Sequence, residues 1–265
     1  MSAPSSAFLF FFILISCTII SCKADQDEAS LEKGSVLFED FFSDIDGSRW
    51  ATSQQSSDTD TGSTDTNLTG SIVTHVITDN LSCFIPNRVD GSLGKLRLSV
   101  KSQTLTCHDT NTAYEFGGGE IQSASTFTSG RFQVNLQASL SNGVMSSFFL
   151  YGNAREIGFH LPGNDPTKVF LSYRKDSTAE IIALRPDNFN AANQYHSYSI
   201  LWEDDLIQWS IDGKAVLGIK KNVPDAPMTL VLSTWITGDR TQADFPASEL
   251  ERYTDYTYVR VETFP

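Results

Sequence analysis

The chain has 265 residues, 40% of them hydrophobic, which is enough for one large all-β domain or two small domains with a sizeable core. Its formal net charge is −13 at pH 7, and its lysines and arginines form no cluster. Because neutralising phosphates requires grouped Lys and Arg, this pattern excludes nucleic acid as an expected partner.

An apolar run near the start of the chain predicts export. It covers residues 7–22, is short for a membrane span and is followed by a polar segment, as in a secretory signal peptide. We therefore expect a signal peptide over residues 1–22 and a tether over 23–35. The sequence Ile19-Ile-Ser-Cys22 resembles a bacterial lipobox, which would place a lipidated cysteine at the mature N-terminus; the alternative is ordinary cleavage nearby. Both outcomes predict a secreted or cell-envelope protein, with membrane contact only through a lipid on Cys22.

Four cysteines occur, and two of them lie in the predicted leader. The remaining pair, Cys83 and Cys107, favours a disulfide because an even pair in an exported domain is typically oxidised. The alternative is a pair of buried free thiols. No third or fourth ligand stands at zinc spacing, so we expect no metal site. No sequence feature indicates a cofactor or an oligomeric state.

From residue 94 onward the chain has the pattern of short strands. The segments 95–100, 131–136 and 258–261 alternate strictly between apolar and polar residues. The segment 206–211 leads into Asp212-Gly213, a dipeptide typical of a hairpin turn. No long stretch has helical periodicity, and no βαβ rhythm occurs. The pattern predicts an all-β fold, an antiparallel sandwich or barrel.

The segment 153–161 reads Asn-Ala-Arg-Glu-Ile-Gly-Phe-His-Leu and alternates like a half-buried strand. Its apolar residues take one face, because successive strand side chains point to opposite sides. The other face presents Glu156, Gly158 and His160. A carboxylate and an imidazole therefore share one face, and the glycine leaves a gap between them.

The sequence around this strand resembles glycoside hydrolase family 16, most closely its lichenase branch of endo-β-1,3-1,4-glucanases. The segments that carry the resemblance are 143–151, 153–161, 165–169, 195–202, 207–214 and 230–235. The resemblance covers residues 36–265. It implies a jelly-roll β-sandwich of two curved sheets, with a glycan-binding cleft across the concave sheet.

In that family the catalytic strand reads Glu-Ile-Asp-Ile/Phe-Glu, and here it reads Glu156-Ile-Gly-Phe-His160. The resemblance places Glu156 at the nucleophile position. It places Gly158 at the position of the Asp that orients the nucleophile, and His160 at the acid/base position. It also implies that family members bond a cysteine pair comparable to Cys83 and Cys107.

The resemblance implies substrate contacts as well. Glu120 would bind sugar hydroxyls, and the further cleft positions are Phe149, Tyr151, Arg174 and Trp235. Aromatic rings stack on sugar faces, whereas core packing is the alternative role for any single aromatic residue. Other family positions are substituted, since the Trp before the catalytic strand is Ala154, the Arg of the Gly-Glu strand is Gln122 and the Asn after the Lys-Val pair is Ser172.

These substitutions decide the expected chemistry. A retaining glycosidase needs two carboxyl groups roughly 5–5.5 Å apart, whereas positions i and i+4 of a strand lie about 13 Å apart unless the strand is concave. An imidazolium can act as a general acid, but a cation beside Glu156 would pair with it. We therefore expect an exported protein that recognises a β-linked polysaccharide such as β-glucan with little or no hydrolysis. The alternatives are an active retaining endo-β-glycosidase and a structural envelope protein.

Overall fold

The computed structural model describes residues 34–52, 80–107, 112–176, 178–237 and 250–263. The expected signal peptide, including Cys22, and the tether up to residue 33 lie outside the described residues. All described residues belong to one unit, 34–265. Within the described segments, no helix is long and apolar enough to cross a membrane.

The strand that carries Glu156 lies in the middle of an antiparallel sheet, here called the β9 sheet. Its strand order is β11-β10-β9-β8-β15-β6, and β2 pairs with β6. The strands are β2 (Trp50–Thr52), β6 (Thr112–Phe127), β8 (Val144–Gly152), β9 (Arg155–Pro162), β10 (Val169–Lys175), β11 (Thr178–Leu184) and β15 (Met228–Ile236).

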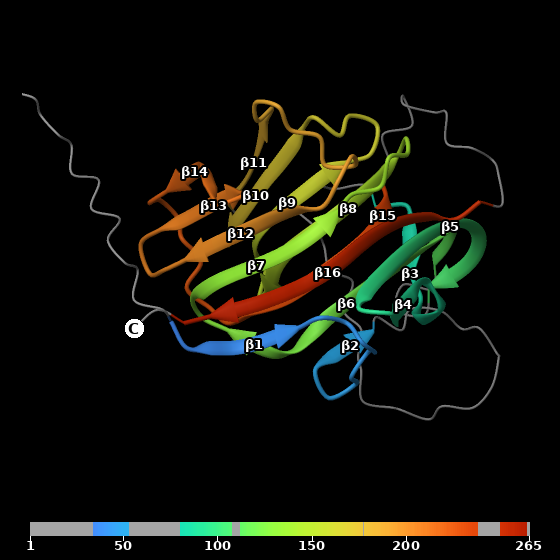
Figure 1. The fold of residues 1–265 in the computed structure, drawn as a ribbon, viewed down its shortest axis with the longest axis horizontal. Helices are drawn as coiled ribbons and strands as arrows, with labels where there is room; N and C mark the ends of the chain where they lie inside the picture. The colour runs from blue at the N-terminus through green and yellow to red at the C-terminus, as the bar shows by residue number, and fades with distance from the viewer. Residues whose placement is uncertain (1–33, 53–79, 108–111, 177, 238–249, 264–265) are drawn as a thin grey trace, which may run out of the picture. The chain divides into compact units, whose positions relative to one another are not determined.

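A second antiparallel sheet, the β7 sheet, has the order β5-β16-β7-β12-β13-β14, with β4 on β5 and β1 on β16. The strands are β1 (Val36–Asp40), β4 (Val89–Ser92), β5 (Lys95–Cys107), β7 (Gly130–Gln137), β12 (His196–Trp202), β13 (Ile207–Ile211), β14 (Lys214–Ile219) and β16 (Arg252–Glu262). In Figure 1 this sheet crosses the front of the view, and β9 to β11 lie behind it.

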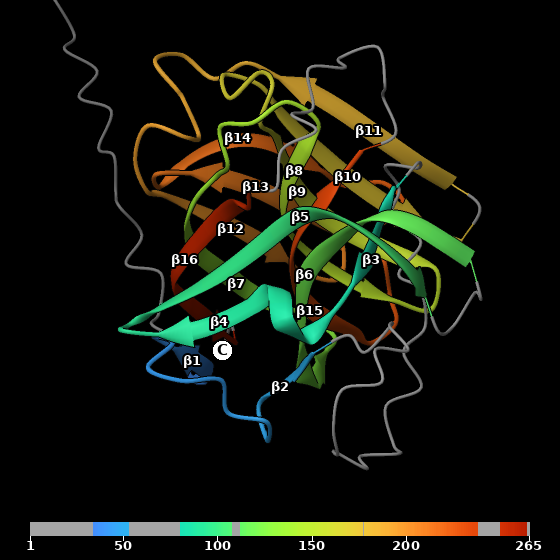
Figure 2. The same cartoon turned by 90° about the vertical axis from the view of Figure 1, so that its right-hand side faces the viewer.

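Strands β5 and β6 link the two sheets. Strand β5 pairs with β16 of the β7 sheet, β6 pairs with β15 of the β9 sheet, and β5 and β6 pair with each other. Figure 2 shows this pair at the side of the sandwich, next to β3 (Ser82–Phe84) and the short 3-10 helix η1 (Pro86–Arg88). Strand β3 runs parallel to β6 and carries Cys83. The disulfide Cys83–Cys107 joins β3 to the end of β5, which confirms the predicted pairing.

The core lies between the two sheets, because alternate residues of each sheet point inward. From the β9 sheet it takes the apolar face of β9, and from the β7 sheet the apolar residues of β7, β12 and β16. The ring of Phe159 contacts that of Tyr198 at a centroid distance of 5.3 Å, and Trp209 donates to the carbonyl oxygen of Gly158 at 3.1 Å. The predicted jelly-roll sandwich and its antiparallel strands are confirmed.

The predicted strand over 153–161 differs from β9 in two respects. Asn153 and Ala154 have φ angles of 51° and 58° and form the turn after β8, so the strand starts at Arg155. Its outer face is also buried, so the expectation of a half-buried strand is wrong. Side chains of the neighbouring strands β8 and β10 contact Glu156 and His160 on this face, which the period of one strand does not reveal.

Candidate active site

The candidate site occupies the face of the β9 sheet that points away from the core. The strand register places three rows across β8, β9 and β10, each centred on one residue of the motif. The rows are Tyr151–Glu156–Arg174, Phe149–Gly158–Ser172 and Ser147–His160–Phe170. The site is therefore assembled from three strands, and only its middle column lies in one sequence segment.

Glu156 and His160 are in direct contact. The Oε1 atom of Glu156 lies 3.2 Å from Nε2 of His160, and both side chains are 0% exposed. The hydroxyl of Ser172 donates to the same carboxylate oxygen at 2.5 Å and lies 2.9 Å from Nε2. These three groups form a closed triangle in which the carboxylate of the nucleophile position is already engaged.

The other ring nitrogen of His160 continues this network. Its Nδ1 atom lies 3.0 Å from the hydroxyl of Ser147, which accepts a hydrogen bond from Nε1 of Trp235 at 3.2 Å. Because Ser147 accepts from Trp235, its own hydrogen can go to Nδ1, and Nε2–H can then donate to Ser172. The contacts fit one directional chain from Trp235 to Glu156, and it places a hydrogen on Nε2 of His160.

The gap expected at Gly158 is filled. A Cβ atom on this glycine would lie 2.6 Å from Cβ of Phe149, 2.9 Å from Oγ of Ser172 and 3.1 Å from Nε2 of His160. The expectation that the glycine leaves a gap between the two polar groups is therefore wrong. The imidazole and the Ser172 hydroxyl lean over Gly158 toward Glu156 and take up the space.

This arrangement decides what the site can do in the described conformation. A retaining mechanism needs its two groups roughly 5–5.5 Å apart, with the anomeric carbon and the glycosidic oxygen between them. Here the groups at the nucleophile and acid/base positions touch at 3.2 Å. A glycosidic bond fits between them only if His160 moves away from Glu156.

The expected sugar-binding residues differ in their access to solvent. Phe149 and Trp235 are 0% exposed and Glu120 is 2% exposed, so all three lie beneath other side chains. Tyr151 and Arg174 are only partly buried, and the guanidinium carbon of Arg174 lies 5.8 Å from the ring centroid of Tyr151. A ligand on this face would therefore reach Tyr151 and Arg174 first.

Sequence reasoning missed Ser147 as a site residue and treated Ser172 only as a substituted position. Both are 0% exposed and both contact His160. The available signal was their setting, because each is a hydroxyl residue within an apolar strand and buried hydroxyls need partners. Within the described ranges, no three His, Cys, Asp or Glu side chains gather as metal ligands would.

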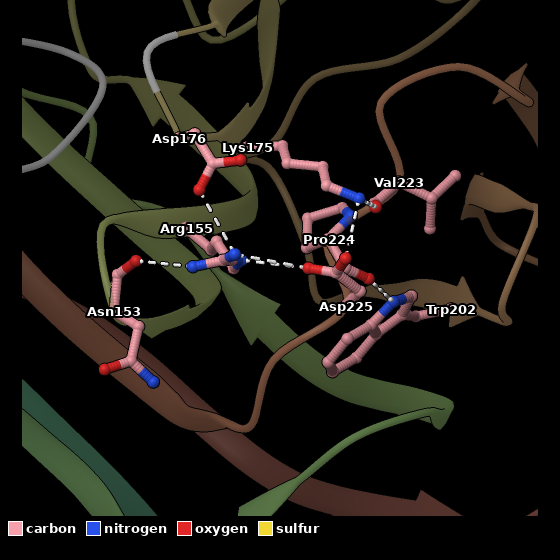
Figure 3. A network of polar contacts seen from close by, with 8 residues as sticks. All are labelled: Asn153, Arg155, Lys175, Asp176, Trp202, Val223, Pro224 and Asp225. Carbon is pink, nitrogen blue, oxygen red and sulfur yellow. Dashed lines mark hydrogen bonds and ion pairs between the residues drawn. The ribbon is translucent and has the colours of Figure 1, made fainter.

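A polar network surrounds Arg155, the first residue of β9. Arg155 contacts Asp176 at 3.1 Å and Asp225 at 3.2 Å, and it donates to the carbonyl oxygen of Asn153 at 2.9 Å. A hydrogen bond from Lys175 lowers the pKa of Asp225. Figure 3 shows how these side chains tie the turn before β9 to the end of β10 and to the segment before β15. The network stabilises the position of the strand directly before the candidate nucleophile.

Comparisons with known proteins agree with this fold. The family model "Glycosyl hydrolases family 16" matches residues 86–257. The β-glucanases of Bacillus licheniformis and Bacillus subtilis are each 29% identical, over 150 and 151 residues, or 54% of this chain. These matches cover 58% and 59% of the two relatives, so the chain spans less than two thirds of their length.

Solved structures extend the similarity of fold over most of the chain. The B. licheniformis β-glucanase structure has a TM-score of 0.68 at 24% identity and covers 87% of this chain and 99% of its own. The laminarinase catalytic domain of Thermotoga maritima has a TM-score of 0.70 at 15% identity, covering 88% and 99%. With the family model matched over more than half of its residues, this chain belongs to glycosyl hydrolases family 16.

Proposed function

We propose that this protein recognises a β-linked polysaccharide such as β-glucan on the outer face of the β9 sheet, and that it hydrolyses this polysaccharide slowly or not at all. The observation that carries the proposal is the contact between Glu156 and His160, at 3.2 Å and with neither side chain exposed. Membership of the family supports a glycan ligand.

Weak hydrolysis follows from the loss of the acid. General acid catalysis contributes about 10²–10⁴-fold by itself, and the acid must protonate the leaving oxygen. In the directional chain described above, the Nε2 hydrogen of His160 points to Ser172, which lies 2.9 Å away, and not to a substrate. Glu156 already accepts a hydrogen bond from Ser172 on Oε1 at 2.5 Å. Glu156 and His160 therefore contact each other and the hydroxyl of Ser172.

Recognition is supported by the relatives and by two side chains. The similar curated proteins are named β-glucanases, and a solved LamA structure from Zobellia galactanivorans, 18% identical, is in complex with laminaritriose and laminaritetraose. Tyr151 offers a partly exposed ring beside the guanidinium of Arg174. Such a pair can stack on a sugar and donate to its hydroxyls. Export, either free or through a lipid on Cys22, is part of the proposal.

An active retaining endo-β-glycosidase is the second candidate. It is favoured by the glutamate at the nucleophile position and by the names of the relatives. This candidate requires His160 to swing out of its contacts with Glu156 and Ser172 when a glycan binds.

Affinity electrophoresis tests recognition. The protein is run in native gels that contain laminarin or mixed-linkage β-1,3-1,4-glucan, and retardation gives Kd. We expect the parent to be retarded and Tyr151→Ala to bind more weakly. Phe41→Ala serves as the control and should bind as the parent does. It removes a ring that is 58% exposed and that follows β1, a strand of the β7 sheet. Equal binding by Tyr151→Ala and the parent would show that the outer face of the β9 sheet is not the binding site.

A further inference from the structure

A group of two tyrosines and an ion pair lies on the outer face of the β7 sheet, on the opposite side of the core from Glu156. Tyr195 and Tyr253 are 37% and 41% exposed. Between them Asp255 accepts from Nε and Nη2 of Arg97, each at 2.7 Å, and from Nζ of Lys95 at 3.1 Å. Here this group is called the tyrosine platform.

The strand register places these residues in one plane. Asp255 on β16 is paired with Arg97 on β5 and with Gln137 on β7. Tyr195 comes directly before His196, the first residue of β12, which neighbours β7. From the spacing of strands and the rise per residue, the two tyrosines stand roughly 12 Å apart across the sheet. Burial raises the pKa of Tyr195, and the charge of Asp255 raises it further.

The ring of Tyr253 is held in place before any ligand binds. The guanidinium carbon of Arg97 lies 4.5 Å from the ring centroid, and the phenol donates to Glu251 at 3.0 Å. Glu251 is itself paired with Arg88, which donates to Gln103 at 2.7 Å. An aromatic ring fixed in this way loses little conformational freedom when another surface stacks on it.

The charges of the tyrosine platform are mostly paired within the group. The carboxylate of Asp255 contacts both cations and offsets one of them, so the three groups together keep a single positive charge. Burial raises the pKa of Asp255, but hydrogen bonds from Arg97 and Lys95 outweigh this and leave the pKa below its usual value. An arginine has five N–H donors and a lysine three, so each retains donors beyond these contacts. Flat rings next to spare donors and a carboxylate suit the apolar faces and hydroxyls of sugars.

We propose that the tyrosine platform is a second binding surface for a neutral polysaccharide, with Tyr195 and Tyr253 stacking on sugar rings and Arg97, Lys95 and Asp255 bonding to hydroxyls. The choice of a neutral β-glycan rests on the proposed function. The second surface would let one molecule contact two glycan chains, or two stretches of one chain, from opposite faces. Such bivalent contact raises the apparent affinity for long polymers more than for short ones.

Affinity electrophoresis in laminarin and in mixed-linkage β-1,3-1,4-glucan tests this surface with the full chain. The double variant Tyr195→Ala/Tyr253→Ala should raise Kd about tenfold, equivalent to about 1.4 kcal/mol. Tyr253→Phe, which keeps the ring, should stay within about twofold of the parent, since stacking uses the ring face. Phe41→Ala is the control for removing an exposed ring. Urea denaturation of each variant checks that the fold is intact.

A measurement on the parent protein makes the test independent of variant folding. Iodination of surface tyrosines, read by mass spectrometry, should slow at Tyr195 and Tyr253 when laminarin or mixed-linkage glucan is present. Unchanged iodination and unchanged Kd of the double variant, together with weaker binding by Tyr151→Ala, would overturn the second surface and leave the proposed function standing. Loss of binding in the double variant but not in Tyr151→Ala would support the second surface and move recognition away from the β9 face. No retardation of the parent in either glucan would overturn both proposals.

Discussion

Adding a single methyl group to β9, at Gly158, should destabilise the protein. The Cβ atom introduced by Gly158→Ala would lie 2.6 Å from Cβ of Phe149, whereas carbon atoms pack best about 3.5–4.0 Å apart. One of the two strands must therefore move by roughly 1 Å, because Cβ of Phe149 is attached to the backbone and cannot rotate away. Overpacking of this kind costs about 1–3 kcal/mol. Gly158→Asp should cost more, since it adds a second carboxylate beside the buried Glu156.

Urea denaturation of Gly158→Ala and Gly47→Ala measures this cost. Gly47 has no atom within 4 Å of an added Cβ, so its substitution reports only the change in the unfolded chain. We expect the first variant to be less stable than the second by about 1–3 kcal/mol. Equal stability of the two variants would refute the packing argument and show that β9 tolerates a side chain at this position.

Three further predictions concern stability. Reducing Cys83–Cys107, which are 24 residues apart, should lower the free energy of unfolding by about 3–4 kcal/mol in guanidinium denaturation, and an unchanged value would contradict this. A hydrogen bond from Arg185 lowers the pKa of Asp165 from 3.8 to about 2. This depressed pKa stabilises the fold above pH 4 and the benefit is lost as pH falls toward 2, by less than about 1 kcal/mol because the pair is exposed. Asp165→Asn should therefore lose less free energy of unfolding than the parent between pH 5 and pH 2 in urea titrations. An equal loss in variant and parent would show that the lowered pKa of Asp165 does not contribute to stability. Arg155→Gln should lower Tm at low salt more than at high salt, because its partners in Figure 3 are exposed carboxylates; a salt-independent difference would point to packing instead.

The sandwich could be predicted because its signals are local. Strict alternation in segments such as 131–136 reflects one buried and one exposed face, and it corresponds to β7 with Val134 in the core. The Asp212-Gly213 turn was predictable for the same reason, since both residues adopt the positive φ angles that this dipeptide tolerates. The Cys83–Cys107 bond was predictable from the count of cysteines, the expectation of export and the resemblance to the family.

The geometry of the candidate site could not be predicted, because it depends on neighbouring strands. On a flat strand Glu156 and His160 would lie about 13 Å apart along the backbone, and sequence does not give the lean of side chains that brings them into contact. The hydroxyls of Ser147 and Ser172 come from β8 and β10, whose register against β9 no single segment specifies. The positive φ of Ala154 was equally hidden, because alanine seldom adopts that conformation.

The most direct test of the account is the release of new reducing ends from laminarin and mixed-linkage β-1,3-1,4-glucan by the parent and by Glu156→Gln. The account predicts binding by the parent without release above the level of the variant, because the groups at the nucleophile and acid/base positions touch each other and leave no room for a glycosidic bond between them. Sustained endo-hydrolysis by the parent that Glu156→Gln abolishes would contradict the account and make this protein a working retaining glycosidase.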